Sequence, residues 1–500
     1  MPVNNYLSII NFVRDVEPRC DDDSYLYPTV VFELDLCRRY GFPNTLLLQY
    51  DALIDEKYIS LIKERSAADG NIETGLWFEV VEPLCRAVGI PWRGRYPWDW
   101  HADVGFLTGY EPGERITLID ECFEKFRSVF GYHPTSVGSW FIDAVSLKYM
   151  KEKYGVRACC ICKEQSLTDG YTLWGGIWSG GYYPSPSNSI LPASGDEDIH
   201  IPTFRMLGAD PIRQYDMGLG DPSKCQGVAS LEPVYSNSGA GSEWVENFLD
   251  LTFRDDEYFA FTQTGQENSF GKESIEKGLE AQFEIIDRYV KEGRFEIKNL
   301  TDVGDIFASK YETTPVQYTL FEKTVPDDGS STFWYQCRKF RLNIHSDERG
   351  VRIRDFQLYS PDFKEKYIDT REESHEAEFR ALPVIDGFRF SDEKIVAGIY
   401  IGSNPREFTV KTEGERAEVT LDNGMQIILT PEGPEFTGEE ISLEWLYSES
   451  AEAKYAFQPG KISIEFAGNM SEPYRAELTV EGGVVSQNKI TGSGHIKICC

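Results

Sequence analysis

Carboxylates, amides and aromatic residues follow seven short apolar runs in the first half of the chain. Asp143 comes after the fourth run, and Glu267 comes after the seventh. If the runs are parallel strands of a barrel, these side chains meet at the edge where such folds hold their sites. Glycoside hydrolysis needs two carboxyl groups across the scissile bond, and flat aromatic rings pack on the apolar faces of sugars. The pattern therefore favours carbohydrate chemistry.

Further candidates for binding a sugar lie at the ends of the same runs and in two aromatic loops. They are Arg14, Asp15, Tyr50, Trp77, Glu79, Trp98, Asp99, Trp100, His101, Trp140, Asp169, Trp174, Arg205, Asp210 and Gln266. Glu79, Asp99 and His101 are expected to bind sugar hydroxyls. The walls of the subsite are assigned to Trp77, Trp98, Trp100 and Trp140.

Several of these residues also have a purely structural interpretation. Asp143 opens a helical pattern, where an N-cap carboxylate accepts from orphan backbone N–H groups. Glu267 fits a solvated loop acid, and the Trp98 to His101 cluster fits a packed loop over the barrel. Sequence alone leaves both interpretations open.

Metal and cofactor sites have weak support. His101 and Asp103 are spaced to share a metal, but no second histidine lies near them in the sequence. The chain shows no Walker loop, no dinucleotide-binding glycine motif after a strand, and no Gly-x-Ser-x-Gly elbow. We therefore expect no metal and no cofactor.

The elements that must position these residues follow a regular order. The apolar runs cover residues 7–13, 45–50, 72–78, 135–141, 156–162, 201–206 and 257–263. Helical patterns follow most of them, at 25–40, 55–65, 81–88, 112–130, 144–153 and 273–290. Repeated strand-then-helix units predict a parallel sheet covered by helices, here an irregular (β/α)7 barrel over residues 1–310. The Gly/Tyr/Pro-rich stretch 175–189 is predicted to lack regular structure.

After residue 311 the pattern changes to short segments with alternating apolar and polar residues. Asn423-Gly424 is the strongest of several hairpin signals between them. This part of the chain, residues 311–500, is predicted to be an antiparallel β-sandwich with few helices.

Composition excludes several classes of partner. Fifty Lys and Arg against 82 Asp and Glu give a formal net charge of −32, which disfavours nucleic acid and anionic membranes. No signal peptide and no membrane-spanning run are evident. The eleven cysteines fit buried reduced thiols better than a disulfide framework. We expect a cytoplasmic protein, in which an oligomer is possible, acting on an oligosaccharide or glycoside.

Two segments carry a resemblance to a known superfamily. The segment 138–156 reads GSWFIDAVSLKYMKEKYGV, and the segment 261–271 reads FTQTGQENSFG. They resemble the fourth-strand and seventh-strand motifs of the seven-stranded irregular barrels that include polysaccharide deacetylases and glycoside hydrolase families 38 and 57. A bacterial subgroup with a deacetylase-like barrel and a β-sandwich tail is similar as well. The resemblance implies that Asp143 is the nucleophile and Glu267 the acid/base.

The chain departs from the metal-binding patterns of that superfamily. Deacetylases carry Asp-Asp after the first strand and a His-x-x-x-His pair after the third, where this chain has Arg14-Asp15 and residues 77–81 without histidine. The His-x-Asp and His-Gln-Pro motifs of families 38 and 57 are missing from the first strand. A metal-independent glycoside hydrolase or transglycosidase is therefore the first hypothesis. The alternatives are a metal-dependent carbohydrate deacetylase that uses Asp15, His101 and Asp103, and a non-catalytic carbohydrate-binding protein.

Overall fold

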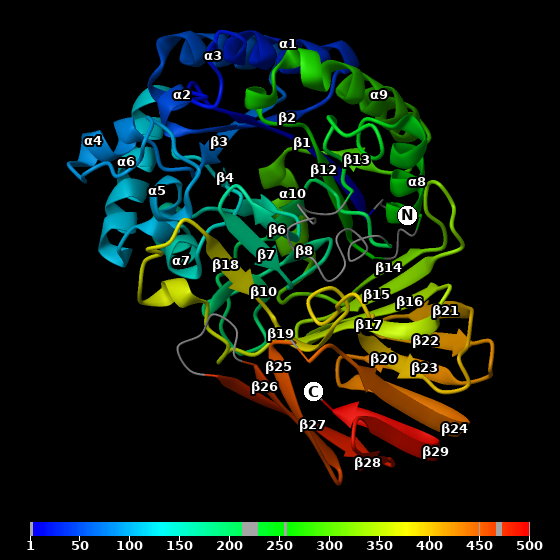
Figure 1. The fold of residues 1–500 in the computed structure, drawn as a ribbon. Helices are drawn as coiled ribbons and strands as arrows, with labels where there is room; N and C mark the ends of the chain where they lie inside the picture. Colours follow the sequence, from blue (N-terminus) through cyan, green and yellow to red (C-terminus); the bar gives the residue numbers. More distant parts are fainter. Residues whose placement is uncertain (1–3, 213–228, 255–257, 450, 467–472, 500) are drawn as a thin grey trace.

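Parallel strands joined by helices build the first sheet of the computed structural model (Figure 1). The structure describes residues 4–212, 229–254, 258–449, 451–466 and 473–499. Seven parallel strands of these residues lie in the order β12 (Ala260–Thr264), β1 (Asn5–Val13), β2 (Asn44–Leu48), β3 (Ile72–Trp77), β4 (Ser136–Gly138), β5 (Ala158–Cys162) and β11 (Thr203–Met206). The rings of Phe204 in β11 and Phe261 in β12 lie 4.5 Å apart, so the two ends of the sheet almost meet. The predicted irregular barrel is confirmed.

The strands follow from apolar runs that are buried on both faces. All residues of β1, β2 and β5 are buried, as a parallel sheet covered by helices requires. The helices on the outside are α1 (Leu26–Tyr40), α2 (Tyr50–Ile54), α3 (Glu56–Asp69), α4 (Glu82–Val88), α5 (Ala102–Gly105), α6 (Pro112–Phe130), α7 (Ala144–Tyr154), α8 (Ser242–Thr252), α9 (Lys272–Lys291) and α10 (Leu300–Lys310). The first residue of the seventh predicted run, Glu257, lies outside the described residues.

The prediction that residues 175–189 lack regular structure is wrong for the second part of this stretch. Short strands form at β8 (Gly181–Tyr182), β9 (Pro184–Ser185) and β10 (Asn188–Pro192). The glycines at 175, 176 and 180 have positive φ and turn the chain, whereas Tyr182 and Tyr183 are fully buried. Burial of these aromatic side chains therefore outweighs the local turn signals.

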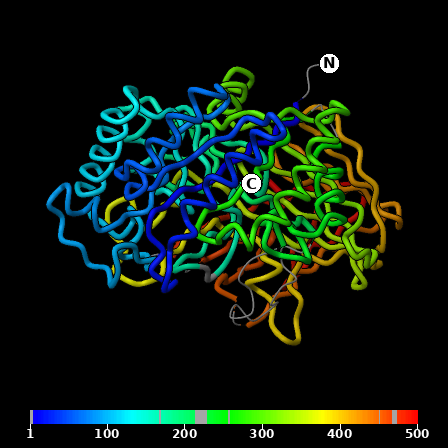
Figure 2. Tube along the Cα trace, turned by 90° about the horizontal axis from the view of Figure 1, so that it is seen from above, coloured from blue at the N-terminus to red at the C-terminus, as the bar shows by residue number. Residues whose placement is uncertain are grey.

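The C-terminal part, predicted to be an antiparallel β-sandwich, is antiparallel, and its strands are connected into one branched sheet. Its 15 strands within the described residues are β14 (Gln317–Phe321), β15 (Ser331–Gln336), β16 (Phe340–Asp347), β17 (Gly350–Leu358), β19 (Leu382–Asp386), β20 (Gly398–Ile401), β21 (Phe408–Glu413), β22 (Arg416–Leu421), β23 (Gln426–Thr430), β24 (Gly433–Leu446), β25 (Ala453–Gln458), β26 (Lys461–Phe466), β27 (Tyr474–Glu481), β28 (Val484–Ser486) and β29 (Lys489–Cys499). The predicted hairpin at Asn423-Gly424 joins β22 to β23, with Gly424 at a φ of 84°. Figure 2 shows this part beneath the side of the barrel built after residue 160, while helices α4 to α6 lie to the other side.

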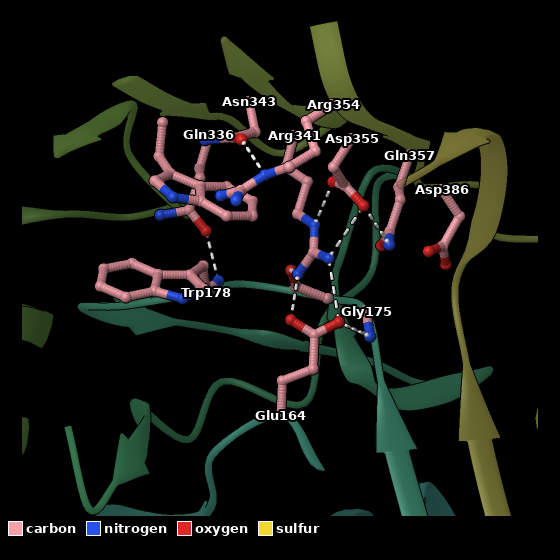
Figure 3. Close-up of polar contacts among 12 residues, drawn as sticks. Glu164, Gly175, Trp178, Gln336, Arg341, Asn343, Arg354, Asp355, Gln357 and Asp386 are labelled. Atoms are coloured by element: carbon pink, nitrogen blue, oxygen red, sulfur yellow. Dashed lines mark hydrogen bonds and ion pairs between the residues drawn. The ribbon is translucent and has the colours of Figure 1, made fainter. Parts of the chain in front are cut away.

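Two connections tie the sheet to the barrel. The hairpin of β6 (Gln165–Thr168) and β7 (Tyr171–Trp174), which follows β5, accepts β18 (Ala377–Arg380) from the C-terminal part as a parallel neighbour of β7. Beside it, Glu164 and Arg341 form a buried ion pair (Figure 3). Together they hold the two parts of the chain against each other.

Two other expectations from the sequence concern the cysteines and membrane-spanning helices. The cysteines that the structure describes are free thiols, and Cys159, Cys160 and Cys162 are fully buried in β5. Within the described ranges, no helix combines the length and the apolar character that crossing a membrane would require.

Candidate active site

The carboxyl ends of β1, β3 and β12 bring one arginine and two glutamates together. Arg14 is the first residue after β1, and Glu79 is the second after β3. Glu267 follows β12, and its backbone pairs with Phe12 of β1. The barrel register thus places three charged side chains, distant in sequence, at one buried point.

The Arg14 guanidinium is the centre of this cluster. Its Nη2 lies 2.6 Å from Glu267 Oε2 and 3.0 Å from Glu79 Oε2, and its Nη1 lies 3.3 Å from Glu17 Oε2. The guanidinium also lies over the ring of Trp98, 4.2 Å from its centroid. Burial alone would lower the pKa of Arg14, but the three carboxylates outweigh it and raise that pKa. Arg14 is therefore a permanent cation at this point.

Glu79 is fixed by indole groups. Trp77 Nε1 donates to Oε2 at 2.8 Å, and Trp140 Nε1 donates to Oε1 at 2.9 Å. The Trp77 ring stacks on Phe12 at 4.1 Å and meets the Trp140 ring edge-on at 5.3 Å. Burial raises the pKa of Glu79 to about 7, although Arg14 pulls in the opposite direction.

Glu267 is the partner carboxyl of Glu79. Burial raises the pKa of Glu267 as well, against the opposing charge of Arg14. One guanidinium nitrogen bonds both carboxylates, so the bonded oxygens of Glu79 and Glu267 are at most 5.6 Å apart. Burial raises the pKa of both carboxyls, and two carboxyls this close titrate as a coupled pair. Such a pair can supply both a proton donor and an anion.

Arg19 forms the partly exposed rim of the cluster and is held there by the buried Glu17. Arg19 donates from Nε and Nη2 to the two oxygens of Glu17, each at 2.7 Å, and its side chain is 33% exposed. The Arg19 guanidinium lies 4.8 Å from the Trp98 ring and 5.6 Å from the Trp100 ring. Its Nη1 lies 3.4 Å from Asp169. Neither Glu17 nor Arg19 was a predicted site residue, although both lie in the loop directly after the first strand.

Asp143 lies in different surroundings from Glu267. It is the N-cap of α7 and fully buried: Oδ1 accepts from Ser146 N at 2.9 Å and Oδ2 from Ser146 Oγ at 2.7 Å. Arg115 Nη1 donates to Oδ1 at 3.0 Å. The contacts described for Asp143 do not include Glu267, so the structural role foreseen as an alternative is present. Its catalytic role stays a prediction.

Other predicted site residues lie at the border of the cluster. Asp15 Oδ1 pairs with Lys57 at 2.6 Å, and Tyr50 OH donates to Glu121 at 2.6 Å. Gln266 Oε1 accepts from the backbone N–H of Glu267 at 2.9 Å. These three side chains support the strand ends.

A third group lies on the side of the barrel that the C-terminal part covers. Trp174 Nε1 donates to Asp386 at 2.8 Å. Arg205 donates to the backbone oxygens of residues 162, 175 and 177, and Asp210 accepts from Trp244 Nε1 at 3.1 Å. These three side chains are buried, and the contacts described for them are structural.

His101, Asp103 and His375 could hold a metal ion. One ligand atom from each lies within 4.8 Å of the others. Burial lowers the pKa of His101, which favours its neutral, metal-binding form. The predicted set of Asp15, His101 and Asp103 is thus brought together only in part, because His375 from the C-terminal part stands beside the other two. At the place where the resemblance would put a deacetylase metal, Arg14 lies between the carboxylates, so those residues do not fit a metal.

Glu33 of α1 is a buried acid that interacts electrostatically with Glu267. Among the described residues, neither of its oxygens has a hydrogen-bond partner. Burial and, next, the charge of Glu267 raise its pKa well above the ordinary 4.5. The folded state therefore binds this proton more tightly than the unfolded state.

A pH titration of stability tests Glu33. A group whose pKa is raised in the folded state contributes its full stabilisation at pH values below its unfolded pKa. That stabilisation is lost as the pH rises toward the folded pKa. Wild-type protein should lose up to about 1.4 kcal/mol per pH unit above pH 4.5 relative to Glu33→Gln. Urea unfolding of both proteins between pH 4.5 and 7 measures this. Glu64→Gln, on the exposed side of α3, should follow the wild-type slope, and an unchanged slope in Glu33→Gln would contradict the assignment.

Comparisons with known proteins give structural matches only. No protein-family model and no curated protein sequence matches the chain. The crystal structure of a candidate glycoside hydrolase/deacetylase from Parabacteroides distasonis is 16% identical and covers 76% of this chain and 91% of its own, with a TM-score of 0.59. A candidate polysaccharide deacetylase from Pseudomonas aeruginosa is 11% identical, covers 62% of this chain and 92% of its own, and has a TM-score of 0.37. A family 57 branching enzyme from Thermococcus kodakaraensis is 10% identical, covers 62% and 72%, and has a TM-score of 0.35. The first match shows a shared fold, which confirms the fold that the resemblance implied.

Proposed function

We propose that the chain is a carbohydrate-active hydrolase that cleaves glycosidic bonds with Glu79 and Glu267. The observation that carries the proposal is the shared contact of both carboxylates with Arg14 at the carboxyl end of the barrel. The structural neighbour described as a candidate glycoside hydrolase/deacetylase supports this class of substrate.

The spacing of the pair favours retention at the anomeric carbon. Retaining enzymes hold their carboxyls about 5–5.5 Å apart, and inverting enzymes about 6.5–9.5 Å apart. The upper bound of 5.6 Å between the bonded oxygens of Glu79 and Glu267 fits the first range. In the first step one carboxylate attacks the anomeric carbon while the other protonates the leaving oxygen. In the second step water cleaves the glycosyl-enzyme bond and gives its proton back to the acid/base.

The hydrogen bonds suggest which carboxyl has which role. Glu79 accepts from two indoles and a guanidinium, and N–H donors stabilise a bare carboxylate. Glu267 accepts one N–H bond, from Arg14 to Oε2, and has a hydrogen bond with the Ser269 side chain. We place the acid proton on Glu267 because Glu79 accepts more hydrogen bonds, although the charge of Glu267 is among the causes that raise the pKa of Glu79. We assign Glu79 as the nucleophile and Glu267 as the acid/base, the role predicted for it from sequence.

Aromatic walls and a narrow rim surround the pair. Trp77, Trp98 and Trp140 exclude water, which strengthens the electrostatic effect of Arg14 on developing charge. Glu267 is 5% and Trp140 is 7% exposed, so a sugar reaches the pair only after the Arg19 side chain moves from the rim. We expect Arg19 and Trp100 to contact the bound sugar first.

A panel of 4-nitrophenyl glycosides tests the proposal. We expect release of nitrophenol from at least one glycoside, and retention of configuration in the first-formed sugar by proton NMR. Release of the inverted anomer would contradict the spacing argument. If no glycoside reacts but acetate is released from an N-acetylated oligosaccharide, the deacetylase alternative holds. Binding without any product would leave the carbohydrate-binding alternative.

A further inference from the structure

Two histidines and an aspartate from distant parts of the chain meet beside the rim. His101 is the N-cap of α5 and Asp103 lies in the first turn of that helix, whereas His375 lies just before β18. The ring centroids of His101 and His375 are 3.9 Å apart, and His375 Nδ1 lies 3.1 Å from Asp103 Oδ1. Two imidazoles and a carboxylate are ligands typical of zinc, with an open position left for water.

The backbone holds these side chains in place. Ala102 N–H donates to the His375 carbonyl at 3.0 Å. Because Ala102 lies between His101 and Asp103, this bond holds the segment of His375 against both of these ligands. Gly170 lies beneath this contact, where a Cβ would come within 2.6 Å of the His375 oxygen and 2.8 Å of the Trp100 oxygen. The cluster therefore belongs to a fixed junction between the barrel and the C-terminal part.

A second layer of contacts supports the ligands. His101 Nδ1 lies 3.7 Å from Asp99 Oδ1, and Asp99 is held by two hydrogen bonds from the Arg95 side chain. Metal-binding histidines typically face such a carboxylate with the ring nitrogen that does not bind the metal. His375 is 67% exposed, which leaves the cluster open to solvent on one side.

We propose that His101, Asp103 and His375 bind a divalent transition-metal ion of the zinc class. The ion replaces the proton between His375 and Asp103 and joins the start of α5 to the segment before β18. The His101 ring lies 5.9 Å from the Trp100 ring, so the ion fixes one side of the rim. The proposed glycosidase mechanism does not use this ion. If the glycosidase proposal failed, the proposal of a metal site would still stand.

Zinc binding to the full-length protein tests the site. Protein stripped with a chelator and titrated with Zn²⁺ alone should bind one tight equivalent by calorimetry. His375→Ala should weaken this binding by more than the roughly 10–100-fold that loss of an outer contact costs. His495→Ala is the matched control, because His495 is also exposed and lies 3.2 Å from Glu435 but lacks a second imidazole. It should bind zinc as wild type does.

Two further measurements keep the result independent of folding. Zn²⁺ should raise the melting temperature of wild type and not that of His375→Ala, while the two metal-free proteins melt alike. Gly170→Ala, which leaves all three ligands in place, should weaken zinc binding because its Cβ separates the segments. Equal zinc affinity in His375→Ala and wild type would overturn the proposal. So would equal affinity for Mg²⁺ and Zn²⁺, because magnesium prefers oxygen ligands.

Discussion

Glu267→Gln is expected to lower kcat by roughly 100- to 10,000-fold, the usual contribution of a positioned acid/base. The amide keeps the shape of Glu267 and still accepts from Arg14, but it cannot donate the proton to the leaving oxygen. Glu79→Gln should cause at least as large a loss, because an amide cannot form the glycosyl-enzyme bond. Initial rates on the best glycoside of the panel, with folding checked by near-ultraviolet circular dichroism, measure both.

Asp143→Asn is the decisive comparison for this pair. Asparagine is as good an N-cap as aspartate, but it weakens the buried contact with Arg115. We expect this variant to lose stability and to keep most of its kcat. A folded but inactive Asp143→Asn beside an active Glu79→Gln would instead restore the nucleophile predicted from sequence.

Chemical rescue separates the two roles within the pair. Azide should restore glycoside cleavage to Glu79→Ala with an inverted product, because it attacks the face that the nucleophile has vacated. In Glu267→Ala the same anion should give a product of retained configuration. The opposite assignment of products would exchange the two roles while leaving the pair intact.

The barrel was predictable because its signals are local. A run such as residues 7–13 is apolar throughout, and burial on both faces of β1 is what such a run predicts. The N-cap role of Asp143 was also readable, since Ser146 follows at the position whose N–H an N-cap accepts from. Glu267 was found because it follows the seventh run directly.

The centre of the candidate site was not predictable, because its contacts are long-range. Arg14 was expected to bind substrate, but nothing local indicates that it pairs with Glu79 and with Glu267, 253 residues away. His375 was not predicted as a ligand for the same reason, since only the pairing of β18 with β7 brings it to Asp103. Ion pairs across a fold depend on register and packing that single-sequence patterns do not contain.

Arg341→Met is expected to lower the free energy of unfolding by about 3–5 kcal/mol, the cost of breaking a buried ion pair. Arg341 Nη1 and Nη2 lie 3.0 and 2.9 Å from the two oxygens of Glu164, at the end of β5 (Figure 3). Its Nε lies 2.8 Å from Asp355 in β17. All three side chains are 0–1% exposed, so the substitution removes a buried cation that both carboxylates contact. Urea unfolding measures the loss, and Lys461→Met, in an exposed pair with Glu477, should cost about 0–1 kcal/mol.

A double-mutant cycle tests whether Glu164 and Arg341 stabilise the fold through their interaction or independently of each other. Glu164→Gln also weakens the bond that Gly175 N–H donates to Oε1 at 2.6 Å, so both single variants disturb the same place (Figure 3). If Glu164 and Arg341 act on each other, the double variant should lose about 0.5–3 kcal/mol less than the two single losses together. Hydrogen exchange should then speed up in β7 and β18, on both sides of the junction. Strictly additive losses with unchanged exchange there would mean that the β7–β18 pairing holds the two parts together without this ion pair.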